Sequence, residues 1–389
     1  MKTLKPLMGS TLLIAGTTIG AGMLALPLEA ANISFGTVTL IMVLLWALML
    51  YTAYLLLDLH QTAPPTATLH TLAMQYLGRN GQRLAGFAML FLFYALCAAY
   101  MAGGGEQLAA KMGAATSQSI APKWGTLVLT LFVAAVVRLG TGPTEKVNRV
   151  LFATKFVLLA GTIFYLAPNV SSANLTHNST TSASVLLAIP VMFTSFGFHG
   201  SVPSIVRYLD GDTRQLKIAV GIGSALPLVL YVIWQWCTLG NLSQSLGSLA
   251  LSDFIALLSQ QGKSVALEPM LNGFADLALL TSFLGVSLGL FHYLDDLFKS
   301  RSSLTVTTIT FLPPLMFALW FPQGFQMALG YAAIALALLA VLLPVAMQVK
   351  KRRLEGNRPM TFGLAGALCC GIGVIVIQLG VSFSAFAAS

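Results

Sequence analysis

The sequence predicts an all-α protein that crosses a membrane many times, built from two five-span repeats in inverted orientation plus an eleventh span. Hydrophobic residues make up 57% of the 389 residues and charged residues only 8%, whereas roughly 25% of the residues in a soluble domain are charged. The hydrophobic residues gather in eleven runs, mostly near the roughly 20 residues that a helix needs to cross a bilayer. Glycines and small polar residues interrupt the first and the sixth run, so we expect these two spans to be discontinuous.

Short polar connectors separate the runs, and none of them is long enough for a soluble domain. We expect the first five-span repeat in residues 1–167, the second, inverted repeat in residues 168–347, and a basic linker with the eleventh span in residues 348–389. The connector after residue 242 has room for a short surface helix. The expected spans cover residues 9–31, 35–58, 83–110, 124–140, 148–167, 183–206, 217–240, 268–293, 304–321, 325–347 and 361–385.

The lysine and arginine residues predict the orientation, because positive charges concentrate in cytoplasmic connectors. With a cytoplasmic N-terminus, 17 of the 21 fall in inner connectors, three fall in outer ones and Lys155 lies inside a span. An odd number of spans then places the C-terminus outside. The net charge of +9 is mainly this orientation signal, so we expect no nucleic-acid partner.

The first interrupted run has three glycines and two threonines between Gly16 and Gly22. Glycine weakens a helix and lets other groups approach the backbone. A broken helix in lipid leaves polar backbone groups unpaired, so it persists only where protein, water or a ligand supplies partners. We therefore expect a binding site here, with one half-helix ending near Gly16 and another beginning near Gly20.

The sixth run repeats this pattern between Pro190 and Pro203. Because the two interrupted runs are five spans apart, they cross the membrane in opposite directions. Interruptions at matching places of two inverted halves are typical of transporters, whose substrate site lies between them. The alternative is that both runs are glycine-rich helices that pack closely against their neighbours.

The two breaks together suit the head group of an α-amino acid. A half-helix that begins in the membrane offers N–H groups to a carboxylate, and one that ends there offers carbonyls to an ammonium group. Neighbouring hydroxyls can supplement the backbone. Nearby aromatic rings favour an aromatic substrate, although each ring could instead serve packing. The expected substrate-binding residues are Gly16, Thr17, Thr18, Ile19, Gly20, Ala21, Gly22, Tyr94, Phe193, Thr194, Ser195, Phe196, Gly197, Phe198 and His199.

Charged residues inside spans are rare and often functional. Lys155 lies about two turns into the fifth span, where it either snorkels to the inner surface or places an ammonium near the bundle centre. In the second case it can couple transport to protons, with Thr281 and Ser282 of the eighth span as partners. Asp276, farther outward on that span, is expected to be a gate or proton group, or else a hydrogen-bonded structural carboxylate. His199 is either a substrate or proton group or a packing histidine.

Enzymatic chemistry has no support in the sequence. It contains no combination of a nucleophile, a base and an orienting group, and no metal-ligand spacing. We therefore expect neither an enzyme nor a cofactor or metal site.

Several long motifs match a known family. In them the chain resembles the bacterial aromatic amino acid permeases over nearly its whole length. The tyrosine-specific branch is favoured, because the tryptophan branch has Thr-Ile-Ile in place of Thr17-Thr18-Ile19 and a tyrosine in place of Phe198. The matching motifs are residues 16–27, 193–206, 281–291, 311–314 and 328–332.

The resemblance implies a leucine-transporter-like fold and symport of an aromatic amino acid, tyrosine favoured, with protons across the bacterial cytoplasmic (inner) membrane. It also implies that Lys155, with Thr281 and Ser282, takes the place of a sodium ion between the first and eighth spans. His292 departs from the family, since we expect an aspartate there. Membrane lipid surrounds the protein, and we expect no obligate protein partner. The alternatives are a tryptophan or broader neutral amino acid permease, and a membrane sensor that binds amino acids without moving them.

Overall fold

The computed structural model describes residues 4–176, 180–242, 249–261, 264–298, 302–322 and 324–388. Within these ranges all regular elements are helical, which confirms the all-α prediction. The helices are α1 (Leu4–Thr18), α2 (Gly22–Ala30), α3 (Phe35–His60), α4 (Leu69–Thr116), α5 (Pro122–Arg138), α6 (Thr141–Leu166), η1 (Ala167–Asn169), α7 (Ser172–Thr176), α8 (Ser182–Thr194), η2 (His199–Ser201), α9 (Val202–Tyr208), α10 (Thr213–Asn241), α11 (Leu251–Gln261), α12 (Leu267–Leu297), α13 (Ser303–Trp320), α14 (Phe325–Leu336), η3 (Ala337–Leu342), α15 (Leu343–Leu354) and α16 (Phe362–Ala388).

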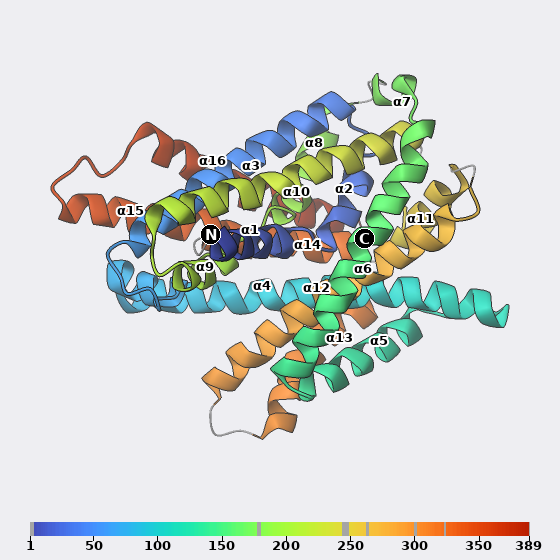
Figure 1. Ribbon diagram of the computed structural model, residues 1–389, viewed down its shortest axis with the longest axis horizontal. Coiled ribbons are helices and arrows are strands. Elements are labelled where there is room, and N and C mark those ends of the chain that lie inside the picture. The colour runs from blue at the N-terminus through green and yellow to red at the C-terminus, as the bar shows by residue number, and fades with distance from the viewer. Residues whose placement is uncertain are drawn as a thin grey trace.

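Many of these helices, singly or joined end to end, are long and apolar enough to cross a membrane. Nine spans in the described ranges meet this requirement, and the bent pair α1 and α2 makes a tenth. The 17 residues of α5 are at the lower limit of a spanning length, so the expected eleventh crossing depends on this helix. In Figure 1, α3, α4 and α10 run along the long axis of the molecule, and α6 and α12 cross them obliquely.

The first interrupted run is broken where the sequence predicts a break, but slightly later. α1 ends at Thr18, α2 begins at Gly22, and the two axes differ by 50°. Gly16 lies inside α1 instead of at its end, because the N–H of Ile19 still donates to the carbonyl of Ala15. The expected half-helix end near Gly16 is therefore wrong by about half a turn.

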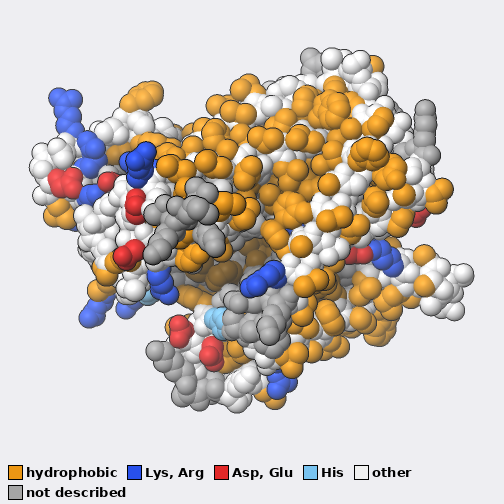
Figure 2. Space-filling view, viewed as in Figure 1, with side chains coloured by type: hydrophobic (Ala, Val, Ile, Leu, Met, Phe, Trp, Pro, Cys, Tyr) orange, Lys and Arg blue, Asp and Glu red, His pale blue; other side chains and the backbone are white. Residues whose placement is uncertain are grey.

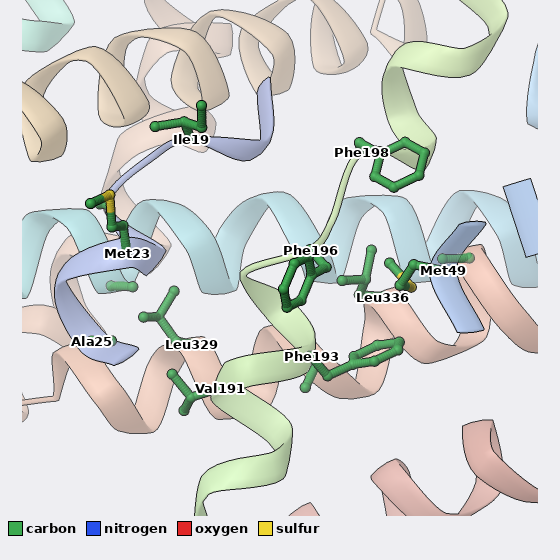
Figure 3. Close-up of a cluster of buried hydrophobic side chains, with 14 of the residues drawn as sticks. Ile19, Met23, Ala25, Met49, Val191, Phe193, Phe196, Phe198, Leu329 and Leu336 are labelled. Carbon is green, nitrogen blue, oxygen red and sulfur yellow. The ribbon is translucent and has the colours of Figure 1, made fainter. Parts of the chain in front are cut away.

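The sixth run is also broken. α8 ends at Thr194, the backbone is not helical through Phe198, and the short turn η2 leads into α9 at Val202. Figure 3 shows side chains of both interrupted spans, Ile19 and Phe196 among them, in one hydrophobic cluster with residues of α14. The two breaks, which are remote in the sequence, thus share one part of the core.

Side chains of α10 donate to backbone carbonyls of α2. Pro27 has no N–H, so the carbonyl of Met23, four residues earlier, lacks its helical partner. The Nε1–H of Trp234 donates to this carbonyl at 3.0 Å, and Nε2 of Gln235 donates to the carbonyl of Leu26 at 3.1 Å. The carbonyl that Pro27 frees in α2 is therefore paired inside the protein, as the membrane interior requires.

Two further helices, α4 and α11, include residues that the sequence analysis assigned to connectors. α4 has 48 residues and a kink at Gly78, whose φ of 69° is one that glycine adopts readily. The expected third span, residues 83–110, lies after this kink. α11 lies in the connector after residue 242, which confirms the predicted short helix there.

On the face that Figure 2 shows, lysine and arginine side chains gather mainly at one end. In α15, near its basic C-terminal turn, Lys351 pairs with Asp58 of α3 at 2.7 Å. The grouping is of the kind that the positive-inside rule describes, and the orientation itself stays a prediction. The counted charges Lys2, Lys263, Lys299 and Arg301 lie outside the described residues.

Candidate functional site

A cavity of about 660 Å³ lies where the two interrupted spans meet. Residues of α1, α4, α6, α9, α12 and α14 complete its wall, and most of them are apolar. Most of the residues that the sequence marks as site residues are among those that line it: Gly16, Thr17, Thr18, Ile19, Gly20, Gly22, Lys155, Thr194, Ser195, Gly197, Phe198, Thr281 and Ser282.

The glycines of the first break let it lie close to neighbouring hydroxyls. A Cβ on Gly20 would be 2.8 Å from Oγ of Ser282, and a Cβ on Gly22 would be 2.9 Å from Oγ of Ser195. The N–H of Ala21 donates to Ser282 Oγ at 3.0 Å. In the described part of the chain, nothing accepts from the N–H groups of Gly20 and Gly22. The beginning of α2 therefore presents free N–H groups and the positive end of its dipole to the cavity.

The carbonyls at the end of α1 already have protein partners. Nζ of Lys155 donates to the carbonyl of Ile19 at 3.0 Å, and Oη of Tyr231 donates to that of Thr18 at 2.6 Å. The same Oη lies 3.0 Å from the carbonyl oxygen of Ser195 in the second break. These findings correct the expectation that the freed carbonyls are all open to a substrate ammonium group.

Lys155 points into the protein instead of snorkelling. Its side chain is buried, with 2% of the residue exposed, and it lies 3.4 Å from Oγ1 of Thr281. Its Nζ is 4.4 Å from the ring centre of Phe152, a cation–π distance. Among the described residues no carboxylate forms an ion pair with it. The ammonium is thus held between α1 and α12 by neutral groups, while Ser282 bonds to the break itself.

Tyr94 does not line this cavity. Its hydroxyl donates to the carbonyl of Ile309 at 2.8 Å, which Pro313 leaves without a helical donor. Its ring lines a separate apolar cavity of about 420 Å³ between α4, α13 and α14. The contact gives Tyr94 a structural role, and the expected contact with substrate stays a prediction.

Five other expected site residues also lie outside the cavity wall. Phe193 and Phe196 are fully buried in the core, and Ala21 contributes its N–H to Ser282. Nε2 of His199 is 2.9 Å from Oγ1 of Thr52, and the histidine is buried against α3. This environment matches the alternative that His199 is a packing histidine. The fifth is Asp276.

Asp276 forms an ion pair with Lys111 of α4. Both side chains are more than a third exposed, and neither lines the cavity. The contact matches the structural alternative of the sequence analysis. A gate role for Asp276 remains a prediction.

Sequence analysis did not single out the donors on α10. Trp234 and Gln235 come three and four residues after Tyr231, so all three lie on one face of the helix. A glutamine and an aromatic ring with an N–H or O–H group on one face of an apolar helix indicate that these groups donate to backbone carbonyls of another segment. Phe152 and Asn148, four residues apart on α6, line the cavity and were also missed.

Comparison with known proteins identifies the chain at family level. The model of the tryptophan/tyrosine permease family matches residues 3–385. The chain belongs to this family. The permease is 39% identical to the tyrosine-specific transport system 1 of Haemophilus influenzae, covering 96% of this chain and 94% of that protein. It is 34% identical to the tryptophan-specific transport protein of the same organism, covering 98% of this chain and 97% of that protein. It is therefore a bacterial amino acid transporter and not an enzyme.

A solved structure supports the fold of this permease. MhsT in complex with L-phenylalanine is similar with a TM-score of 0.64 over 96% of this chain and 98% of that one, at 13% sequence identity. At this identity the likeness shows the fold alone, which is that of leucine-transporter-type proteins. The coarse fold expectation of the sequence analysis is confirmed.

Proposed function

We propose that this permease imports an aromatic amino acid, with tyrosine favoured, together with protons across the bacterial cytoplasmic membrane. The observation that carries the proposal is Lys155, whose ammonium binds the carbonyl of Ile19 at the edge of a cavity shared by both breaks. The names of the tyrosine-specific and tryptophan-specific relatives support the substrate class.

The cavity offers separate places for the two ends of such a substrate. The free N–H groups of Gly20 and Gly22 suit the carboxylate, and Thr17, which carries a hydroxyl, lines the same cavity. The apolar part of the wall includes Phe152 and Phe198, against which an aromatic side chain can pack in offset or edge-on contacts. Phe93 and Tyr100 also line the cavity, so the aromatic contacts are expected among these four rings.

Lys155 supplies the proposed link to protons. While protonated, it ties α6 to the end of α1 through Ile19 and lies beside Thr281 of α12. Loss of the proton would leave a neutral amine and weaken the hold on the half-helix. Binding of a proton and binding of substrate would then favour the same arrangement of α1, which is the requirement for coupling.

The wider proposal is alternating access between two inverted repeats, residues 1–167 and 168–347, with residues 348–389 outside the repeats. In this arrangement the N-terminus is cytoplasmic and the C-terminus is outside. Movement of one helix bundle against the other exposes the central site to one side at a time.

The test is uptake of labelled tyrosine by the purified permease in liposomes with imposed gradients. We expect accumulation with an inward proton gradient and none with a sodium gradient alone. Sodium-dependent uptake without proton dependence would contradict the role of Lys155. Competition by unlabelled tryptophan, phenylalanine and serine distinguishes a tyrosine permease from a tryptophan or broader one. A sensor would show ligand-stabilised melting but no accumulation.

A further inference from the structure

Tyr231 of α10 lies between the two interrupted spans. Its Oη is 2.6 Å from the carbonyl oxygen of Thr18, the last residue of α1, and 3.0 Å from that of Ser195, just beyond α8. The side chain is fully buried, and its ring packs edge-on against Phe196 with 5.4 Å between ring centres. One side chain thus contacts both breaks without lining the cavity.

A phenol is well suited to this place. Both carbonyls lie where a helix ends, so they lack the usual backbone donor four residues later. A tyrosine hydroxyl has one proton, which these two acceptors share. Without it, two buried carbonyl oxygens would face each other unpaired, at the full cost of their lost hydration. The hydroxyl therefore holds the end of α1 to the end of α8.

The spacing of the two breaks matters for the cavity. Gly22 approaches Ser195 so closely that a Cβ on the glycine would be 2.9 Å from the serine Oγ. Both residues line the cavity. A shift of one break relative to the other would therefore change the shape of the wall on both sides.

We propose that Tyr231 is a positioning residue of the substrate site, which fixes one break relative to the other so that both contact the same amino acid. Tyr231 acts through the backbone of the breaks and does not touch the substrate. The inference rests on the proposed function, because it concerns how the amino acid site is held in shape.

The variant Tyr231→Phe tests the proposal because it removes only the hydroxyl. In liposomes we expect the half-saturating tyrosine concentration to rise about tenfold. We expect the maximal rate to change by less than about twofold, because the lost interaction serves binding equally in the ground state and the transition state. Tyr293→Phe is the matched control, since it removes a hydroxyl that donates to the carbonyl of Gly86 at 3.2 Å and neither residue lines the cavity. Its half-saturation should equal that of the wild type.

Phe196→Leu provides a second variant if Tyr231→Phe does not fold. It keeps the hydroxyl but removes the ring against which the tyrosine packs. We expect half-saturation to rise about threefold, and the double variant to be no worse than Tyr231→Phe, because residues acting through one contact are not additive.

The outcomes separate this inference from the proposed function. If the wild type takes up tyrosine and both single variants stay within about twofold of its half-saturation, the positioning role is wrong. A rise of similar size in Tyr293→Phe would also overturn it, because the effect would then be a general loss of stability. If the wild type takes up no aromatic amino acid, the proposed function fails first and the inference falls with it.

Discussion

Lys155 differs from the other paired lysines in what it contacts. Lys111 and Lys351 each form an ion pair with a carboxylate, whereas Lys155 contacts a carbonyl, a hydroxyl and aromatic rings. A group held by neutral partners can lose its charge without leaving an opposite charge unpaired. This is the property that a proton-coupling residue needs.

Lys155→Met tests this property while keeping the volume of the side chain beside Phe152. We expect tyrosine counterflow to persist at a rate within about threefold of the wild type, because the cavity keeps its other polar groups. Accumulation driven by a proton gradient should be lost. Both are measured with labelled tyrosine in liposomes. Retention of proton-driven accumulation would mean that Lys155 is only structural.

The two roles considered for Tyr94 predict different results for Tyr94→Phe. The structure uses its hydroxyl to pair the carbonyl of Ile309, so we expect a loss of about 1–3 kcal/mol in stability from the unpaired buried group. Thermal unfolding in detergent should show a lower melting temperature, with unchanged half-saturation for tyrosine. A large change in half-saturation at unchanged melting temperature would restore the substrate-contact prediction.

At the scale of elements, α10 supplies most of the side-chain donors to the carbonyls of the broken first span. Through Tyr231, Trp234 and Gln235 it donates to one carbonyl of α1 and two carbonyls of α2. A proline and a break in one span would otherwise leave several backbone groups unpaired in the membrane interior. The stability of the first span therefore depends on a helix about 200 residues later.

Trp234→Phe measures this dependence. The variant keeps a ring against Phe274 but leaves the carbonyl of Met23 without its donor, so we expect a loss of about 1–3 kcal/mol. Trp236→Phe, on the same helix, is the control, because its indole N–H makes no hydrogen bond among the described residues. Thermal unfolding of both variants in detergent compares them. Equal melting temperatures would show that the bond to Met23 contributes little.

Features that depend on residues close together in the sequence could be predicted, whereas contacts between residues far apart in the sequence mostly could not. The breaks were predictable because glycines and hydroxyls within a few residues of each other interrupt an otherwise apolar run. The pairing of Lys155 with Thr281 could be predicted because both lie at a similar depth in apolar spans, and the family resemblance implies the same pairing. The roles of Tyr94 and Tyr231 could not be predicted, because their acceptors lie 215 and 213 residues away. In the sequence alone, such a tyrosine looks like any other aromatic residue of a span.

At the scale of the molecule, the wall of the cavity suggests which side it faces. The wall includes Leu12 and Leu13 before the first break and Ser201 and Ser204 after the second. With a cytoplasmic N-terminus and inverted repeats, all four belong to cytoplasmic halves of their spans. Figure 2 shows a hollow with a hydrophobic floor beside the beginning of α1. We therefore expect this conformation to face inward.

Labelling of Ser204→Cys tests the direction. In a background with Cys369 and Cys370, which are exposed, replaced by serine, a membrane-impermeant maleimide should label it in inside-out vesicles only. Tyrosine should slow the labelling, because Ser204 lines the cavity. Thr116→Cys, at the far end of α4, should react in right-side-out vesicles only. The reverse pattern would invert the predicted orientation.

Because the donors to the first span come much later in the sequence, they also determine when this span can reach its final form during synthesis. The carbonyls of Thr18, Met23 and Leu26 find their donors 213, 211 and 209 residues later. At roughly 5–20 residues per second of synthesis, the ribosome needs about 10–40 s to produce those donors. During this interval the first span cannot adopt its final broken form in lipid without unpaired groups. We expect it to wait as a straighter helix or beside the insertion machinery, and to bend only when α10 enters the membrane.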